Sequence, residues 1–144
     1  MVVHEKVGQD VCDIFRELFD CRFPIEKIAF PEAYGGNDSL IMEDNATSAY
    51  NDRYPDKSGG PFSYHMVGLA IDINPRVNPF WKSDQTIEPD SGYLYMDRTQ
   101  DFVGKIDKAS ECYRIFRAHG WRWGGDFKQS KDWQHFDRPD LWER

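Results

Sequence analysis

Cysteine is scarce in this sequence, and long hydrophobic runs are missing. Of the 144 residues, 3 are cysteines (Cys12, Cys21 and Cys112), which cannot all pair within one chain and lack the C-x-x-C spacing of a zinc knuckle. A bridge from Cys12 or Cys21 to Cys112 is conceivable, but buried free thiols are the simpler expectation. Because no stretch reaches the roughly 18 apolar residues that a membrane span requires, we expect no membrane insertion.

Positive charge is also in short supply. The chain has 18 Lys and Arg residues against 25 Asp and Glu residues, a formal net charge of -7. Such a field repels phosphate backbones and anionic lipid headgroups, so nucleic acid and membrane surfaces are not expected partners. Residues 1–10 carry charges where a signal peptide would have its apolar segment. We therefore expect a chain that stays in the cell, leaves it by another route, or has lost a leader.

The length and the composition favour one folded domain over residues 1–144. The hydrophobic fraction is 40% and the aromatic fraction 15%, which lacks the signature of a disordered chain. Residues 1–44 are interpreted as a scaffold of helix and strand, and the motifs described below lie within residues 45–136. The sequence does not indicate an oligomeric state.

Apolar residues at helical spacing predict two helices. The first covers residues 7–20, and the second begins near Ile106 and ends at His119 and Gly120. His119 is assigned to the last helical turn and His4 to a frayed terminus, so neither is placed in a functional site.

Short strands are predicted between and after these helices. They cover residues 28–30, 40–42, 68–73, 121–123 and 133–136, and a long ordered excursion occupies residues 74–97. The expected fold class is α+β, a small, mostly antiparallel sheet flanked by helices.

His65, Asp72, Asp132 and His135 are the candidates for chemistry. Alternation in residues 68–73 places Asp72 on the strand face opposite three aliphatic side chains, and Gly68 lets the backbone bend between His65 and Asp72. Zinc hydrolases use three His or carboxylate ligands and leave one position for water, and His135 can supply the third ligand. Asp132 is close enough in sequence to His135 to act as the base for that water.

Each of these residues also has an ordinary structural explanation. His65 can be a hydrogen-bonded loop residue, Asp72 can cap a turn, and Asp132 can be a solvated charge. A buried unpaired carboxylate on an apolar strand is nevertheless costly, which favours a partner for Asp72. A fold in which these residues never meet remains open at this point.

Two signatures in the chain resemble those of a known enzyme family. Residues 63–72 read SYHMVGLAID and match S-x-H-x-x-G-x-A-x-D, and residues 132–135 read DWQH and match [DE]-x-x-H. Both are similar to the zinc D-alanyl-D-alanine carboxypeptidase family, which includes VanY-like and VanX-like enzymes and phage L-alanyl-D-glutamate endolysins. The likeness extends from about Asn45 to Phe136 and includes NATSAYNDR (residues 45–53), IDINP (71–75) and WRWGGD (121–126).

The resemblance implies a role for each matching residue. His65, Asp72 and His135 would bind Zn²⁺, and Asp132 would be the general base. Arg53 falls where the family has an arginine, which would stabilise the oxyanion or bind a substrate carboxylate. A solvent-facing Arg53 is an equal alternative. Ser63 would contact substrate or cap its turn. Aspartate in place of glutamate at position 132 resembles the endolysin-like and VanY-like branch.

The resemblance further implies a fold, a substrate and a location. The fold would be like that of the Hedgehog domain and the D,D-peptidases. The substrate would be a stem peptide of bacterial peptidoglycan, cut as by a D-Ala-D-Ala carboxypeptidase or an L-Ala-D-Glu endopeptidase. Such a substrate implies a secreted, periplasmic or cell-wall-associated protein, or delivery by a phage. The alternative from a different class is a zinc-stabilised binding module without catalysis.

Overall fold

Two helices pack together and against the central sheet of the molecule. The computed structural model describes residues 1–51 and 62–142. Helix α1 (Gly8–Asp20) buries Val11, Ile14 and Leu18, the apolar stripe that predicted it. Helix α3 (Glu111–Ala118) lies beside α1 and contributes Phe116 to the same core. The first predicted helix is therefore confirmed almost to its ends.

The second helix begins later than its apolar spacing predicts. Ser110 Oγ accepts a hydrogen bond from the Tyr113 N–H, which fixes the start of α3 at Glu111, whereas Ile106 lies in the preceding turn. This cap satisfies one of the amide groups that a helix N-terminus leaves unpaired. The predicted end is correct, because Gly120 adopts a φ of +83° just after the helix.

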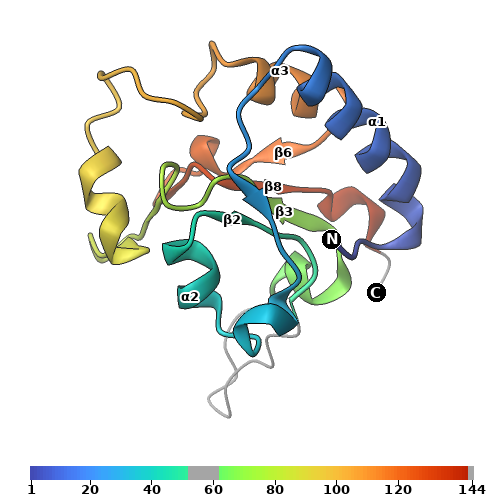
Figure 1. Cartoon of the computed structure of the whole chain (residues 1–144), viewed down its shortest axis with the longest axis horizontal. Coiled ribbons are helices and arrows are strands. Elements are labelled where there is room, and N and C mark those ends of the chain that lie inside the picture. Colours follow the sequence, from blue (N-terminus) through green and yellow to red (C-terminus); the bar gives the residue numbers. More distant parts are fainter. Residues whose placement is uncertain (52–61, 143–144) are drawn as a thin grey trace.

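The central sheet is antiparallel and has the strand order β3-β8-β6. Its strands are β3 (Ala70–Asp72), β8 (His135–Asp137) and β6 (Arg122–Trp123). In the β3–β8 register, Asp72 lies directly opposite His135. Residues far apart in the sequence thus become neighbours on one sheet (Figure 1).

Two smaller sheets complete the strand structure. One is antiparallel with the order β5-β4-β7, made of β5 (Ile87–Glu88), β4 (Phe80–Trp81) and β7 (Lys131–Asp132). The other pairs β1 (Lys27–Ile28) with β2 (Ala46–Thr47) in parallel. The mixed α+β class and the mostly antiparallel pairing are confirmed, although the strands form separate small sheets.

The prediction of a strand over residues 40–42 is wrong. These residues belong to helix α2 (Asp38–Glu43), in which Ile41 and Met42 are buried. Asn37 caps the helix, because its side chain accepts a hydrogen bond from the Leu40 N–H. A three-residue apolar run fits either element, and the cap decided between them. The strand predicted at residues 28–30 also differs, since β1 covers Lys27–Ile28.

The long segment over residues 74–97 is ordered, as predicted, and carries β4, β5 and a 3₁₀ helix (Asp90–Tyr95). Further 3₁₀ helices connect the other elements: Glu5–Val7, Pro31–Tyr34, Tyr64–Val67, Gly124–Asp126 and Pro139–Leu141. No helix in the described ranges 1–51 and 62–142 has the length and apolar character to cross a membrane.

The N-terminal segment is anchored rather than frayed. The His4 N–H donates to the Gly68 carbonyl at 2.9 Å. Gly68 has a φ of +67°, and a Cβ there would lie 2.6 Å from the His4 nitrogen. Only glycine fits this close approach, so Gly68 lets the chain bend between His65 and Asp72, as the sequence predicts.

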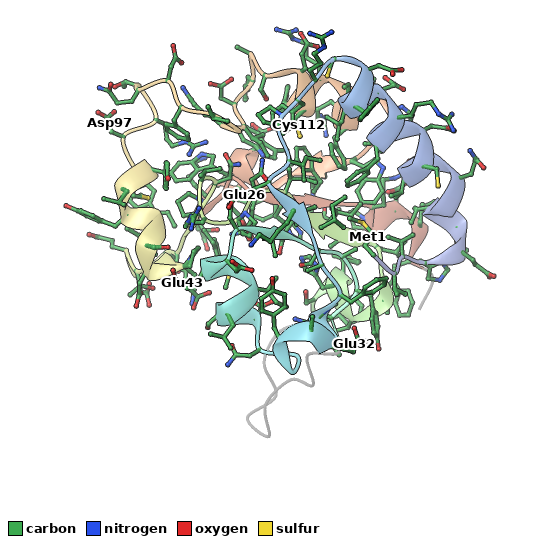
Figure 2. The ribbon with its side chains drawn as sticks, viewed as in Figure 1. Met1, Glu26, Glu32, Glu43, Asp97 and Cys112 are labelled. Carbon is green, nitrogen blue, oxygen red and sulfur yellow. The ribbon has the colours of Figure 1, made fainter. Side chains whose placement is uncertain are left out.

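Apolar side chains fill the space between the helices and the central sheet (Figure 2). Phe116 and Phe136 stack with their ring centroids 4.0 Å apart, which joins α3 to β8. The cysteines are all free, but only Cys112 is buried, so the expectation of buried thiols fails for Cys12 and Cys21. Ile71 on β3 and Phe136 on β8 pack into this core and thereby hold the strands that carry Asp72 and His135.

Candidate metal centre

His65 is held by contacts at its backbone and at one side of its ring. Ser63 Oγ accepts a hydrogen bond from the His65 N–H at 3.3 Å and caps the 3₁₀ helix Tyr64–Val67. His65 Nδ1 lies 2.6 Å from the Ala49 carbonyl oxygen. A carbonyl can only accept, so Nδ1 carries the proton and Nε2 is free to bind a cation.

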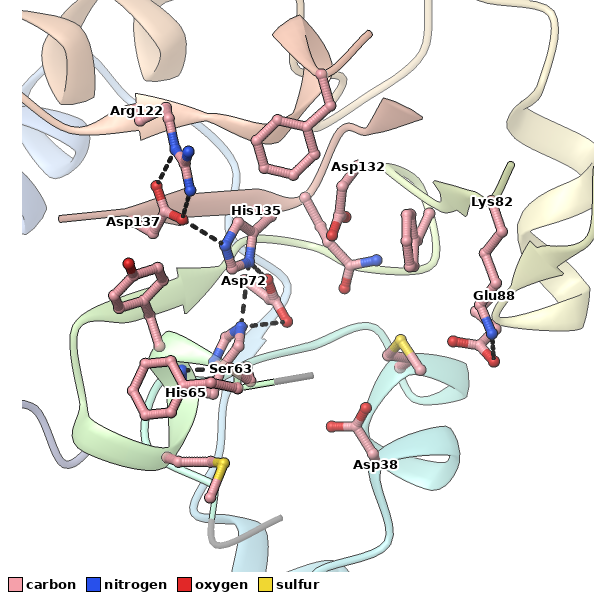
Figure 3. A pocket seen from close by; sticks show the side chains of 17 residues that line it. Asp38, Ser63, His65, Asp72, Lys82, Glu88, Arg122, Asp132, His135 and Asp137 are labelled. Atoms are coloured by element: carbon pink, nitrogen blue, oxygen red, sulfur yellow. Dashed lines mark hydrogen bonds and ion pairs between the residues drawn. The ribbon is translucent and has the colours of Figure 1, made fainter. Parts of the chain in front are cut away.

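The two sheet residues complete a group of nitrogen and oxygen donors (Figure 3). Asp72 Oδ2 lies 3.1 Å from His65 Nε2, and Asp72 Oδ1 lies 3.0 Å from His135 Nδ1. The two imidazole nitrogens are 3.2 Å apart. Among the described residues, His65, Asp72 and His135 form the group of acidic or metal-binding side chains able to hold a metal ion.

Behind His135 a second carboxylate fixes the ring. Asp137 Oδ2 lies 3.3 Å from His135 Nε2, so it accepts the hydrogen bond of the ring nitrogen that faces away from Asp72. Arg122 donates to Asp137 through Nε at 2.8 Å and through a terminal nitrogen at 2.5 Å. A carboxylate behind a ligand imidazole is the usual outer arrangement of protein metal sites, since it orients the ring and increases its basicity.

Charges in this group favour a bound cation. Burial lowers the pKa of His135, but its hydrogen bonds with Asp137 and Asp72 outweigh burial and raise that pKa to about 10. Burial raises the pKa of Asp72, yet the electrostatic interaction with His65 and the hydrogen bonds with both histidines hold that pKa far below its usual range. The buried carboxylates therefore stabilise positive charge at this position, and a metal ion between the same donors supplies it.

Asp132 lies on the neighbouring sheet at the edge of the same group. It pairs with Phe80 across β4 and β7, and its charge contributes to the raised pKa of His135. Gly124 makes this proximity possible, since a Cβ there would lie 2.5 Å from the Asp132 carbonyl oxygen and 3.1 Å from His135 Cβ. The structure thus brings together all four residues that the sequence singled out as a site.

The comparison with protein families agrees with this geometry. Residues 56–138 match the family model described as D-alanyl-D-alanine carboxypeptidase, which spans more than half of the chain. The chain belongs to the D-alanyl-D-alanine carboxypeptidase family. Membership implies a metallopeptidase, and the resemblance noted in the sequence is confirmed. Comparisons with curated proteins and with solved structures give no match.

The carboxypeptidase-family site opens into a cleft of about 600 Å³, the size of a small-molecule or peptide pocket. Its walls come from α2, the segment of residues 62–66, both antiparallel sheets and the turn after β6. Residues that line it besides the candidate ligands include Asp38, Met42, Phe62, Phe80, Lys82, Glu88, Arg122, Phe127, Gln134 and Asp137. Helix α2 lies within residues 1–44, so this segment forms part of the cleft wall as well as scaffold.

Ser63 and Arg53 are the two predicted substrate contacts, and the structure describes one of them. Ser63 lines the cleft and caps its own turn, so the capping alternative is observed and its contact with substrate stays a prediction. Arg53 lies outside the described residues. Of the aromatic residues near the motifs, Tyr64 lines the cleft, whereas Trp123 is buried in the core.

Sequence reasoning missed Asp137, Arg122 and Gln134 as parts of this site. Asp137 had a usable signal, because residues two apart on a strand share a face and His135 and Asp137 have this spacing. Gln134 had none, since a single glutamine between an aspartate and a histidine does not indicate its surroundings.

Proposed function

We propose that this chain is a zinc-dependent metallopeptidase that hydrolyses a peptide bond in the stem peptides of bacterial peptidoglycan. The observation that carries the proposal is the buried group of His65, Asp72 and His135, which adjoins Asp132 at the wall of a cleft. Family membership supports a peptide substrate and a hydrolytic reaction.

The donor spacing fits zinc. A tetrahedral ion with bonds of about 2.0–2.1 Å has neighbouring donors about 3.3 Å apart. The His65 and His135 nitrogens are 3.2 Å apart, and Asp72 approaches each of them through a different oxygen, at 3.1 and 3.0 Å. One donor atom from each residue lies within 4.8 Å of the other two, a spacing that one ion can draw together. Two imidazoles and one carboxylate are also the donor types that catalytic zinc sites use.

Each group has a distinct part in the proposed reaction. The metal, when bound, supplies Lewis acidity that polarises the scissile carbonyl and acidifies a water molecule. Asp132 accepts the proton of the attacking water and passes it to the leaving amine. Asp137 keeps His135 oriented through the hydrogen bond at Nε2. Arg53 is proposed to stabilise the developing oxyanion, and Ser63 to donate a hydrogen bond to substrate.

A zinc-stabilised binding module is the rival function. A structural zinc site is closed by four protein ligands, whereas a catalytic site keeps one position open. Within the part of the chain that the structure describes, the group contains three donor residues and borders a cleft. This arrangement favours catalysis. It also fits the fold type that we infer, that of the D,D-peptidases and the Hedgehog domain.

Digestion of purified muropeptides with a pentapeptide stem tests the proposal. Protein loaded with Zn²⁺ is incubated with the muropeptides, and mass spectrometry identifies the new termini. Loss of D-alanine indicates a D-Ala-D-Ala carboxypeptidase, and release of peptides that begin with D-glutamate indicates an L-Ala-D-Glu endopeptidase. A chelator should abolish either product. Absence of any metal-dependent product would overturn the proposed function.

Such a substrate also sets where the protein acts. We propose that it works in the cell wall or periplasm, after export or after delivery by a phage. We expect the zinc-loaded protein to cleave both isolated muropeptides and intact wall sacculi.

A further inference from the structure

A buried glutamine beside the candidate metal centre has a side-chain oxygen with no hydrogen-bond partner among the described residues. Gln134 is 2% exposed, and its Oε1 is inaccessible and unpartnered among the residues that the structure describes. Its backbone is firmly placed, because the Gln134 carbonyl accepts the Ile73 N–H at 3.0 Å. Gln134 lies between Asp132 and His135 in the sequence and lines the same cleft as both.

The other buried amides of the molecule behave differently. Asn45 donates to Glu26, Asn51 to Asp38, and Asn74 to the Pro24 carbonyl. Asn78 donates to the Gly104 carbonyl and accepts from the Ile106 N–H. Buried polar groups are nearly always paired in this way, since an unpaired one destabilises the fold. Gln134 is therefore an exception that calls for an explanation, and it lies in the cleft.

We propose that the Gln134 side chain binds a main-chain peptide group of the substrate next to the scissile bond. A carboxamide offers an N–H donor and a carbonyl acceptor side by side, and rotation about its terminal bond turns the enclosed oxygen toward the cleft, where the two groups complement the C=O and N–H of a peptide backbone. Gln134 lines the same cleft as Asp132 and His135, so the cleft that would hold the scissile bond also borders this residue. The inference rests on the proposed peptidase function and adds a substrate-binding residue to it.

Kinetics of Gln134→Met with the purified pentapeptide muropeptide test this role. Methionine has nearly the same length and volume but cannot form the hydrogen bonds. Because the amide binds substrate in the ground state as well as in the transition state, we expect KM to rise roughly 5- to 50-fold while kcat changes less than about twofold. Zinc content should stay that of the wild type. Gln129→Met makes the same change at an exposed position outside the cleft and should leave KM unaltered.

Thermal unfolding separates substrate binding from a purely structural role. If Gln134 only holds a buried water, Gln134→Met lowers the unfolding midpoint and leaves KM unchanged, and the inference is overturned. If Gln134 binds substrate, removal of an unpaired amide leaves the midpoint equal or higher while KM rises.

An NMR titration tests the contact without turnover. In zinc-loaded Asp132→Asn protein, the side-chain NH₂ resonances of Gln134, assigned by their loss in Gln134→Met, should shift on addition of the muropeptide. A shift confined to other residues contradicts the inference. Failure of the wild type to cleave any muropeptide instead counts against the proposed function, and the titration then decides on Gln134 alone.

Discussion

In the proposed reaction, Asp132 is the side chain that transfers the proton. The structure places it beside His135 on the neighbouring sheet, at the distance that Gly124 allows. Its assigned task is proton transfer, and metal binding is left to His65, Asp72 and His135. The two tasks can therefore be separated by substitution.

Asp132→Asn should lower kcat on muropeptides by about 10²- to 10⁴-fold, the usual contribution of a general base. Zinc content, measured by elemental analysis, should remain that of the wild type, because the ligand group is intact. Near-full activity of the variant would refute the base assignment, and loss of zinc would make Asp132 a ligand instead.

At the residue scale, the sequence predicted the candidate residues that the structure brings together, but not the residues that support them. His65, Asp72, Asp132 and His135 could be found because their types and spacing form two motifs. Gln134 could not, since its meaning depends on burial, which arises from the pairing of its backbone with Ile73. The His65 ring is held by the Ala49 carbonyl oxygen. Every residue has a backbone carbonyl, so the residue type at position 49 does not indicate this contact.

Strand β8 joins the metal group to its support. His135 faces Asp72 through one ring nitrogen and Asp137 through the other, and Asp137 is fixed by Arg122 from β6. One element thus supplies a candidate ligand and the carboxylate that orients it.

Asp137→Asn should weaken zinc affinity by about 10- to 100-fold, because the amide orients the imidazole less well and does not increase its basicity. Competition with a chromogenic chelator measures the affinity. Asp140→Asn is the matched control, since Asp140 is an exposed carboxylate that pairs with Arg138. Equal affinities of the Asp137 and Asp140 variants would show that Asp137 does not support the metal.

At the element scale, prediction succeeded where periodicity was long and failed where it was short. Helix α1 has several turns of apolar spacing and was found almost to its ends. Residues 40–42 of helix α2 are too few to show a period and therefore fit a strand as well, whereas the Asn37 cap belongs to a helix. The start of α3 was shifted because Ile106 continues the apolar spacing outside the helix.

At the scale of the whole molecule, His119 links α1 and α3, the two longest helices of the described residues. His119 Nδ1 lies 2.5 Å from Asp10 and Nε2 lies 2.8 Å from Glu17, both on α1. Arg138 donates to the His119 carbonyl and lies 3.9 Å from Asp10. The Glu17 hydrogen bond raises the His119 pKa, partial burial opposes it, and Asp10 adds to the rise.

The raised pKa predicts a stability difference that depends on pH. Since the folded state holds the His119 proton more tightly than the unfolded state, the stabilisation is complete below the ordinary pKa of 6.5 and is lost as the pH rises through the folded value. Urea unfolding of metal-free protein should therefore show a larger free-energy gap between wild type and His119→Gln at low pH than at high pH. His4→Gln, which removes a ring bonded to a backbone N–H, is the control. A gap that does not vary with pH would contradict the prediction.

The arrangement of the sheets was the part of the whole fold least open to prediction. The α+β class followed from the order of patterns, but division into separate small sheets depends on pairings such as Phe80 with Asp132, which no local pattern encodes. The contribution of α2 to the cleft also depends on long-range packing, so residues 1–44 could be interpreted only as scaffold from the sequence.

Metal content is the most direct test of a zinc site formed by His65, Asp72 and His135. The purified protein is saturated with Zn²⁺, dialysed against metal-free buffer and subjected to elemental analysis beside a His65→Ala, His135→Ala double variant. A single zinc site built from these ligands predicts about one zinc ion per wild-type chain and almost none in the double variant. A wild type that retains no zinc, or a double variant that retains as much as the wild type, would contradict it.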